Sequence, residues 1–306
     1  MSLSIPEHYR RAFSDNFQHA IQQEVQKLGN RVMVDNFTGK SKVYQDMDEF
    51  EFVERLGRLT NSNPSEVTAA ARQLTKVQFK CQKIFDRKDD EFLGTLGRPD
   101  SEVMQGMRFA WNRTVDTKVA LAAVDPVYGG VEPYVTPTVL PATQKVVVNS
   151  TRAVPAGTGN NTNLTPWKII RAVSILKANE INVNEEECFI AMDASMEAAL
   201  IYAAEQSPND VWAKMVSSWM EGKNTKLFGL TPVMTERLVD TGSGLHKCIV
   251  WSKRQGICVA PDKLDIHIDV IPTRDHAVQI SAYGDYGFIR RYEKAVVEIM
   301  CDTTVA

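Results

Sequence analysis

The sequence lacks any apolar run near the ~20 consecutive residues that a membrane-spanning helix needs, so we predict no membrane partner. It also lacks a strong charge of either sign: 35 Lys and Arg stand against 38 Asp and Glu, a net charge of -3. This balance argues against a large basic groove for nucleic acid. The hydrophobic fraction of 43% and the charged fraction of 24% are ordinary for a soluble globular protein with a sizeable core.

Cysteine is scarce, and its pattern excludes a disulfide framework. The five cysteines are odd in number, far apart in the sequence and never spaced as a Cys-x-x-Cys pair. We therefore expect reduced, mostly buried thiols in a protein made in a cytoplasm. They are Cys81, Cys188, Cys248, Cys258 and Cys301.

Signatures of catalysis are also missing. There is no Gly-x-Ser-x-Gly motif, and residues 94–97 (GTLG) have neither the spacing nor the lysine of a phosphate-binding loop. His246 and Cys248 share one face of a predicted strand, as a thiolate–imidazole pair would, but no third residue that orients the histidine is evident. We interpret Cys248 as a core cysteine and predict no catalytic and no cofactor-binding residues. The basic pair Arg290 and Arg291 is interpreted as a surface or interfacial salt-bridge pair.

One alternating strand, residues 264–271, carries the only pattern that could bind a metal ion. Asp265, His267 and Asp269 share a face of this strand, and His276 lies nearby in the sequence. A metal-dependent enzyme that uses these four residues is one alternative function. The favoured interpretation is an ordinary solvent-facing strand edge, so we predict no metal site and no enzyme activity.

The strongest positive feature is a long amphipathic helix over residues 99–124, which would span ~35 Å. Its length is typical of a strut to which other elements attach. The apolar stripe is formed at steps of three and four by Met104, Met107, Trp111, Val115, Val119 and Ala122. The polar residues expected on the opposite face are Gln105, Asn112, Arg113 and Asp116.

The N-terminal third predicts an arm and a ribbon. A capping box, Ser4 with Glu7, begins a helix that ends at Gly29 and carries Phe13, Phe17 and Ile21 on one stripe. Residues 31–35 and 42–46 are predicted to form a hairpin around residues 36–39. Residues 76–82 alternate, with Val77, Phe79 and Cys81 on the apolar face. An isolated ribbon cannot stabilise itself in water, so its apolar face needs its own domain or another molecule.

Past the loop at residues 150–163 the pattern becomes that of a mixed α/β domain. Thr165, with Pro166 after it, is predicted to cap one helix, and Asp193 another. Residues 188–192 (CFIAM) read as a short buried strand, and residues 211–220 as a helix. The chain is expected to finish in sheet, with strands at residues 277–281 and 289–300 on either side of a turn at residues 283–287.

In this order the elements resemble those of the major capsid proteins of tailed bacteriophages, whose shell fold is shared with encapsulins. Three stretches carry the resemblance: SIPEHYRRAFSDNFQHAIQQ, FDRKDDEFLGTLGRPDSEVMQGMRFAWNRTVDTKVALAA and DIHIDVIPTRDHAVQISAYGDYGFIRRYEKAVVEIMCD. The resemblance implies an α+β fold with four parts. These are an N-terminal arm at residues 1–29, an extended β-hairpin loop (E-loop) with flanking strands at 30–92, a peripheral domain at 93–150 with 263–306, and a mixed α/β axial domain at 151–262.

The resemblance also implies a function without catalysis. It implies a major head protein that self-assembles into the hexamers and pentamers of an icosahedral virion shell, in the host cell cytoplasm, around packaged double-stranded DNA that it does not bind sequence-specifically. A separate scaffolding protein, a portal and a decoration protein are the implied partners. An encapsulin-type compartment is the alternative within the same fold. The predicted inter-subunit contacts are Phe13, Phe17, Ile21, Val77, Phe79 and Cys81.

Overall fold

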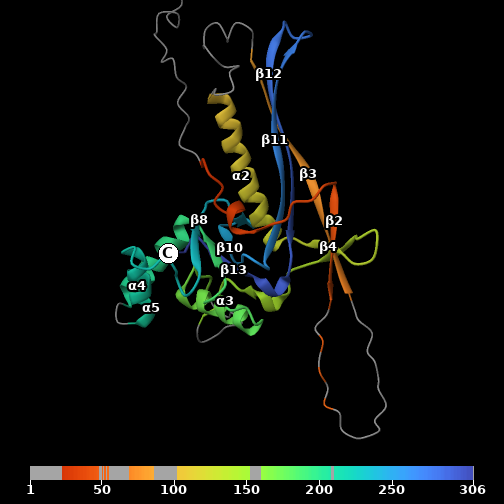
Figure 1. Ribbon diagram of the computed structural model, residues 1–306. Helices are drawn as coiled ribbons and strands as arrows, with labels where there is room; N and C mark the ends of the chain where they lie inside the picture. Colours follow the sequence, from red (N-terminus) through yellow and green to blue (C-terminus); the bar gives the residue numbers. More distant parts are fainter. Residues whose placement is uncertain are drawn as a thin grey trace, which may run out of the picture. The chain divides into compact units, whose positions relative to one another are not determined.

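The computed structural model describes residues 23–47, 50, 52, 54, 69–85, 102–151, 160–207 and 210–305, and these form a mixed α+β fold (Figure 1). The α-helices are α2 (Glu102–Val124), α3 (Pro166–Ala178), α4 (Ala194–Gln206) and α5 (Val211–Met220). The strands are β1 (Met33–Val34), β2 (Ser41–Met47), β3 (Ala69–Phe85), β4 (Val127–Gly129), β5 (Thr136–Thr138), β6 (Lys145–Val146), β7 (Cys188–Met192), β8 (Thr231–Met234), β9 (Val239–Asp240), β10 (Leu245–Ser252), β11 (Ile257–Ile271), β12 (Ala277–Arg290) and β13 (Val296–Asp302). Short 3-10 turns occur at η2 (Gly29–Arg31), η3 (Ala142–Gln144) and η4 (Glu293–Ala295).

The chain divides into two compact units, and each is described by itself. Unit 1 comprises Met1–Gln26, Gln78–Thr114 and Asp262–Asp285. Unit 2 comprises Lys27–Val77, Val115–Pro261 and Tyr286–Ala306. Among the helices that the structure describes, none combines the length and the apolar character needed to cross a bilayer.

The described strands form two sheets. One has seven strands in the order β1-β11-β12-β3-β4-β5, with β2 paired to β3. The other has six strands in the order β6-β13-β10-β7-β8, with β9 paired to β10, and it lies wholly in unit 2. Helix α3 packs against β13 and β6 of this second sheet, and α4 packs against α5 (Figure 1).

The largest group of buried apolar residues in unit 2 packs around the six-stranded sheet. All five residues of β7, a strand inside this sheet, are buried, so both of its faces are covered by other parts of the chain. The Thr165 hydroxyl accepts a hydrogen bond from the Lys168 amide (3.4 Å), and Asp193 Oδ1 accepts one from the Met196 amide (2.8 Å). Both predicted helix caps are therefore confirmed, as is α5 at residues 211–220.

The predicted hairpin around residues 36–39 is wrong. Strand β1 pairs in parallel with β11, with Met33 opposite Cys258, whereas β2 pairs antiparallel with β3, with Ser41 opposite Thr75. The two segments are consecutive in sequence but join different neighbours. A turn-like sequence fixes only the local bend and not the partner of each strand, which depends on pairing distant in sequence.

The predicted turn at residues 283–287 is also wrong, because β12 runs unbroken from Ala277 to Arg290. Its two glycines are required by packing and not by a bend. In unit 1, a Cβ atom on Gly284 would lie 2.5 Å from the Trp111 ring. In unit 2, a Cβ atom on Gly287 would lie 3.0 Å from the Leu74 side chain. A glycine inside a strand often marks such a close approach.

Helix α2 confirms the predicted apolar stripe over its described length. In unit 1, Met104 and Met107 are buried, and in unit 2, Val115 and Val119 are each 1% exposed. Residues 99–101, where the predicted helix begins, lie outside the described residues. Most of the N-terminal helix, which was predicted to end at Gly29, lies outside them too. Its last part is wrong, because residues 23–28 are not helical and a 3-10 turn follows at Gly29–Arg31.

One prediction for this helix fails: Asp116, expected on the polar face, is 0% exposed. Within unit 2, α2 is buried along a second line as well, where Ala120 is 1% exposed and Ala123 is 0% exposed. Asp116 lies on that line at steps of four and seven, so its carboxylate faces packed main chain instead of water.

Candidate functional site

The most distinctive surface of unit 2 is the ribbon, defined here as residues 41–75. Its described part is the antiparallel pairing of β2 with β3, from Ser41 opposite Thr75 to Met47 opposite Ala69. Polar and charged residues of this pairing hold it in place, and two described residues beyond it, Phe50 and Phe52, are apolar and exposed. A two-stranded ribbon is not stable on its own, so these two features decide how it is held and what it can contact.

A buried ion network fixes the base of the ribbon. Arg72 of β3 binds Glu293 through both guanidinium nitrogens, with Nη1 at 2.6 Å from Oε1 and Nη2 in contact with Oε2. Arg72 Nε also lies 3.7 Å from Asp46 Oδ2, across the ribbon. The three side chains are 13–14% exposed, so solvent screens their charges weakly. Bidentate arginine–carboxylate pairs fix orientation as well as distance.

The network continues along one face of β2. Arg291 Nη2 donates to Asp46 Oδ1 (2.6 Å), and the Arg291 guanidinium stacks over the Tyr44 ring at 4.2 Å from its centroid. The Tyr44 hydroxyl and Lys42 Nζ both donate to Asp35 Oδ2, at 2.6 Å and 2.5 Å. Every second residue of β2 (positions 42, 44 and 46) thus takes part. The ribbon is tied to unit 2 by directional polar contacts.

Arg290 and Arg291 both form salt bridges, as predicted, but neither lies on the surface, which corrects that part of the interpretation from the sequence. Arg290 is 0% exposed, and its guanidinium donates to the main-chain carbonyls of Ala123 (3.0 Å), Asp125 (2.8 Å) and Thr138 (3.0 Å). Burial lowers the pKa of Arg290, and Glu293, 3.6 Å from Nε, opposes that shift. The two neighbouring side chains point in different directions. Arg290 binds the main chain at the end of α2, and Arg291 binds Asp46 of the ribbon.

The network makes the ribbon base sensitive to acid. The hydrogen bonds from Lys42 and Tyr44 lower the pKa of Asp35 below its ordinary 3.8. Burial raises the pKa of Glu293, but the hydrogen bond and charge of Arg72 outweigh it and hold that pKa below its ordinary 4.5. Carboxyl groups with depressed folded-state pKa values stabilise the fold fully above their unfolded values.

We therefore predict that the free energy of unfolding falls as pH drops from about 4.5 through the depressed pKa values of Glu293 and Asp35. Urea unfolding measured from pH 7 to pH 2.5 tests this. In Glu293→Gln, stability should be lower at pH 7 and the loss on acidification smaller, because one titrating group is gone. An acid profile identical to that of the wild type would show that Glu293 does not contribute.

Apolar side chains are exposed beyond the ribbon base. Met47 is 73% exposed, Phe50 71% and Phe52 106%. Val77, a predicted inter-subunit contact just past the paired segment of β3, is 54% exposed. Met47, Phe50 and Phe52 thus expose three large apolar side chains within six residues, and exposed apolar area gains stability when another molecule covers it.

The other predicted contact residues have different surroundings. In unit 1, the Phe79 ring meets the Trp111 ring edge-on at 6.0 Å between centroids. Cys81 packs there against a cluster that includes Met107 and Ile280. Both side chains are half-buried within their own chain. The remaining predicted contacts, Phe13, Phe17 and Ile21, lie outside the described residues.

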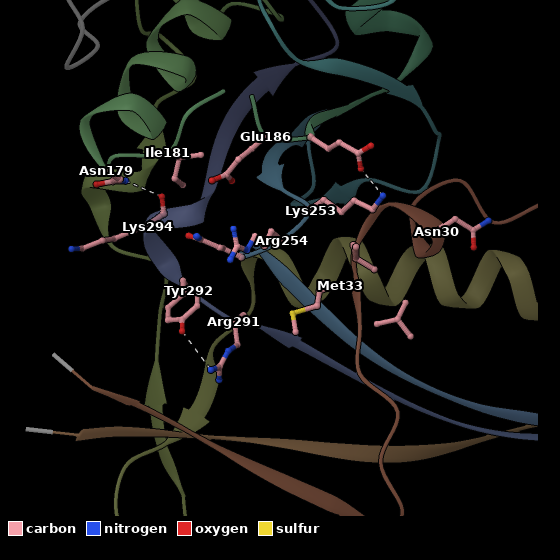
Figure 2. Close-up of a pocket in the computed structure, with 14 residues that line it drawn as sticks. Asn30, Met33, Asn179, Ile181, Glu186, Lys253, Arg254, Arg291, Tyr292 and Lys294 are labelled. Atoms are coloured by element: carbon pink, nitrogen blue, oxygen red, sulfur yellow. Dashed lines mark hydrogen bonds and ion pairs between the residues drawn. The ribbon is translucent and has the colours of Figure 1, made fainter. Parts of the chain in front are cut away.

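A pocket of about 1050 Å³ within unit 2 lies beside this network (Figure 2). Arg291 and Tyr292 line it from the segment just after β12, and Met33 lines it from β1. Both acidic groups at its wall have partners. Lys253 Nζ lies 2.5 Å from Glu187 Oε2, and the Ser252 hydroxyl donates to Glu186 Oε2 (2.8 Å). Its described lining contains no serine, cysteine or histidine.

The structure does not assemble the proposed metal ligands. Asp265, His267, Asp269 and His276 are all exposed, and the His267 ring packs near the Tyr283 ring at 6.1 Å between centroids. Across the described ranges, no group of three or more His, Cys, Asp or Glu side chains comes together in a way that could hold a metal ion. The exposure of Asp265, His267 and Asp269 is that of a solvent-facing strand.

The second weak candidate, His246 with Cys248, gains an orienting residue that the sequence did not reveal. His246 Nδ1 lies 2.8 Å from Asp193 Oδ2. Burial, however, raises the pKa of the Cys248 thiol well above its ordinary value, with Cys301 and Asp193 adding to the shift. A thiol that stays protonated is a poor nucleophile, so Cys248 is a core cysteine, as predicted. All five cysteines are free.

Comparison with known proteins identifies the family. The family described as phage capsid protein matches residues 5–303 of the chain. The chain belongs to the phage capsid protein family. As such it is a structural protein of the bacteriophage virion shell. No curated protein sequence matches this capsid protein.

Solved capsid structures share the fold of this capsid protein over nearly its whole length. A structure from Mycobacterium phage Che8 is similar with a TM-score of 0.63 and 15% identity, covering 100% of both chains. The capsid of Ralstonia phage GP4 gives 0.64 and 11%, covering 99% of this chain and 97% of that one. The capsid of Myoviridae phage XM1 gives 0.63 and 14%, covering 97% and 98%. At such low identity the likeness establishes the α+β capsid fold that the sequence predicted.

Proposed function

We propose that this capsid protein is the major capsid protein of its phage and self-assembles into the hexamers and pentamers of an icosahedral shell around packaged double-stranded DNA. The observation that carries the proposal is the family match over residues 5–303. The exposed Phe50 and Phe52 beyond a rigidly held ribbon base support it, because a shell of identical chains needs overlapping apolar edges. We infer a structural role without catalysis.

The proposal assigns parts of the chain to parts of the shell. Residues 1–29 act as the N-terminal arm, 30–92 contain the E-loop, 93–150 with 263–306 form the peripheral domain, and 151–262 form the axial domain. The arm and the ribbon contact neighbouring copies. A separate scaffolding protein, a portal and a decoration protein complete the particle, assembly takes place in the host cytoplasm, and the DNA is held without sequence-specific binding. A net charge of -3 supports this last point.

The test is assembly of the chain with and without its arm. We expect the full chain, expressed alone and concentrated, to form rings, sheets or closed particles in negative-stain electron microscopy. A chain that starts at Gln23 should remain a folded subunit by circular dichroism but lose at least nine-tenths of those assemblies, because the apolar stripe of Phe13, Phe17 and Ile21 is gone. A full chain that stays monomeric at high concentration would contradict the proposal. Normal assemblies from the truncated chain would show that the arm is not needed for assembly.

A further inference from the structure

A buried carboxylate on α2 binds the main chain at the place where the arm joins unit 2. Asp116 Oδ2 accepts a hydrogen bond from the Lys27 amide (2.7 Å). Asp116 Oδ1 accepts two more, from the amides of Leu28 (2.9 Å) and Gly29 (3.0 Å). Three consecutive main-chain N–H groups therefore converge on one side chain that is 0% exposed.

The sequence of the arm junction explains why a distant acid is needed there. The turn η2 begins at Gly29, and Leu28 holds its cap position without a side-chain hydrogen bond. The first N–H groups of a helical turn have no partner within the turn, and leucine cannot supply one. A side chain at the cap would in any case reach the second or third N–H of the turn and not the amides of residues 27–29, so Asp116 supplies their acceptor from α2. Three charge-assisted bonds offset the cost of burying its charge.

The chain after this point is held firmly within unit 2. Leu28 is 1% exposed and Val32 is 3% exposed. Trp251 Nε1 donates to the Arg31 carbonyl (2.9 Å), and β1 follows at once in parallel with β11. Val25, just before the three bonded amides, is 65% exposed. The bonds to Asp116 therefore lie where the chain passes from exposed to buried.

The Asp116 carboxylate fixes the direction of the main chain at residues 27–29, which an apolar side chain could not do. Ala120 and Ala123 lie on the same buried line of α2 as Asp116. A leucine or methionine at position 116 could also fill this buried position with apolar contacts. Apolar contact is not directional, whereas N–H groups bond well to an oxygen only along a narrow range of angles. Asp116 therefore selects a single course of the main chain at residues 27–29.

We propose that Asp116 is a positioning residue for shell assembly: it fixes the main chain at residues 27–29 and thereby presents the N-terminal arm to a second copy of this chain. The inference rests on the proposed function, in which the arm contacts a neighbouring subunit. It adds the residue that sets where the arm starts. Asp116 itself touches no neighbour; it acts through the main chain that it holds.

The test is Asp116→Asn in the full-length chain. An amide oxygen can keep the two bonds to Leu28 and Gly29, but the amide nitrogen then faces the Lys27 N–H, donor against donor. We expect trypsin to cleave after Lys27 and Arg31 at least tenfold faster, as followed by mass spectrometry, and pelletable assemblies to fall at least tenfold. Circular dichroism should remain that of the folded subunit. Asp125→Asn, which removes the same charge at an exposed side chain just after α2, should change neither readout.

The same variant in the chain that starts at Gln23 separates this inference from the proposed function. If the arm is the target of the positioning, Asp116→Asn should lower assembly no further once residues 1–22 are absent. Normal assemblies from full-length Asp116→Asn, with truncation still abolishing them, would overturn the role of Asp116 and leave the proposed function standing. Normal assemblies from the truncated chain would instead overturn the arm itself and this inference with it.

A second variant keeps the test decisive if Asp116→Asn does not fold. Asp116→Glu keeps the charge but carries the carboxylate roughly 1.5 Å further from the helix, which shifts the three bonded amides. We expect faster cleavage after Lys27 and fewer assemblies than in the wild type, at nearly unchanged thermal stability. Wild-type cleavage and assembly in Asp116→Glu would also count against the positioning role.

Discussion

Arg72→Ala should destabilise the subunit by about 3–5 kcal/mol, since it removes one partner of a buried ion pair and leaves the other charged. Glu293 would lose both hydrogen bonds from the guanidinium, and Asp46 would lose the cation 3.7 Å away. The Glu293 and Asp46 side chains are only 14% and 13% exposed. Water therefore cannot fully replace the hydrogen bonds and the charge of the lost guanidinium. Urea unfolding at pH 7 measures the change.

Two further variants isolate the pair from general damage. Arg72→Ala with Glu293→Ala should cost much less than the sum of the two single changes, because no orphaned charge remains. Lys223→Ala, which breaks a pair of similar length to Glu221 at the surface, should leave the unfolding midpoint unchanged. Additive effects in the double variant would show that Arg72 and Glu293 do not stabilise each other.

Local chemistry made much of the second half of the chain predictable. Thr165 and Asp193 begin their helices as expected, since a capping side chain acts within three residues. Strand β7 was predicted to the residue, because a run of five apolar residues between polar ones has few alternatives. The fold class followed from the order of such elements, and the family match agrees with it.

Contacts distant in sequence could not be predicted in the same way. The Arg72–Glu293 pair joins residues 221 positions apart, and nothing near either one marks the other. The face shared by Lys42, Tyr44 and Asp46 was a usable signal, because polar residues at every second position of a strand share their surroundings. Ala120 and Ala123 were the corresponding signal for Asp116, since small side chains on a helix mark a close approach.

Replacing Phe50 and Phe52 together by serine should abolish assembly without weakening the subunit. Their side chains are 71% and 106% exposed, so folding gains little from them, and the unfolding free energy should change by less than about 0.5 kcal/mol. In the proposed shell a neighbouring copy covers them. Burying a phenylalanine contributes about 1.5–3 kcal/mol, so losing two weakens each contact by a factor on the order of 100 or more.

The matched control is Phe50→Leu with Phe52→Leu, which keeps an apolar surface at the same two positions and should keep assembly. Sedimentation of concentrated protein, with negative-stain imaging of the pellet, measures both variants. The contrast with Arg72→Ala is the decisive point. Arg72→Ala should lower the stability of the subunit, whereas the phenylalanine changes should lower only its assembly with other copies. Normal assemblies from the double serine variant would show that the ribbon beyond Met47 is not covered by a sister subunit.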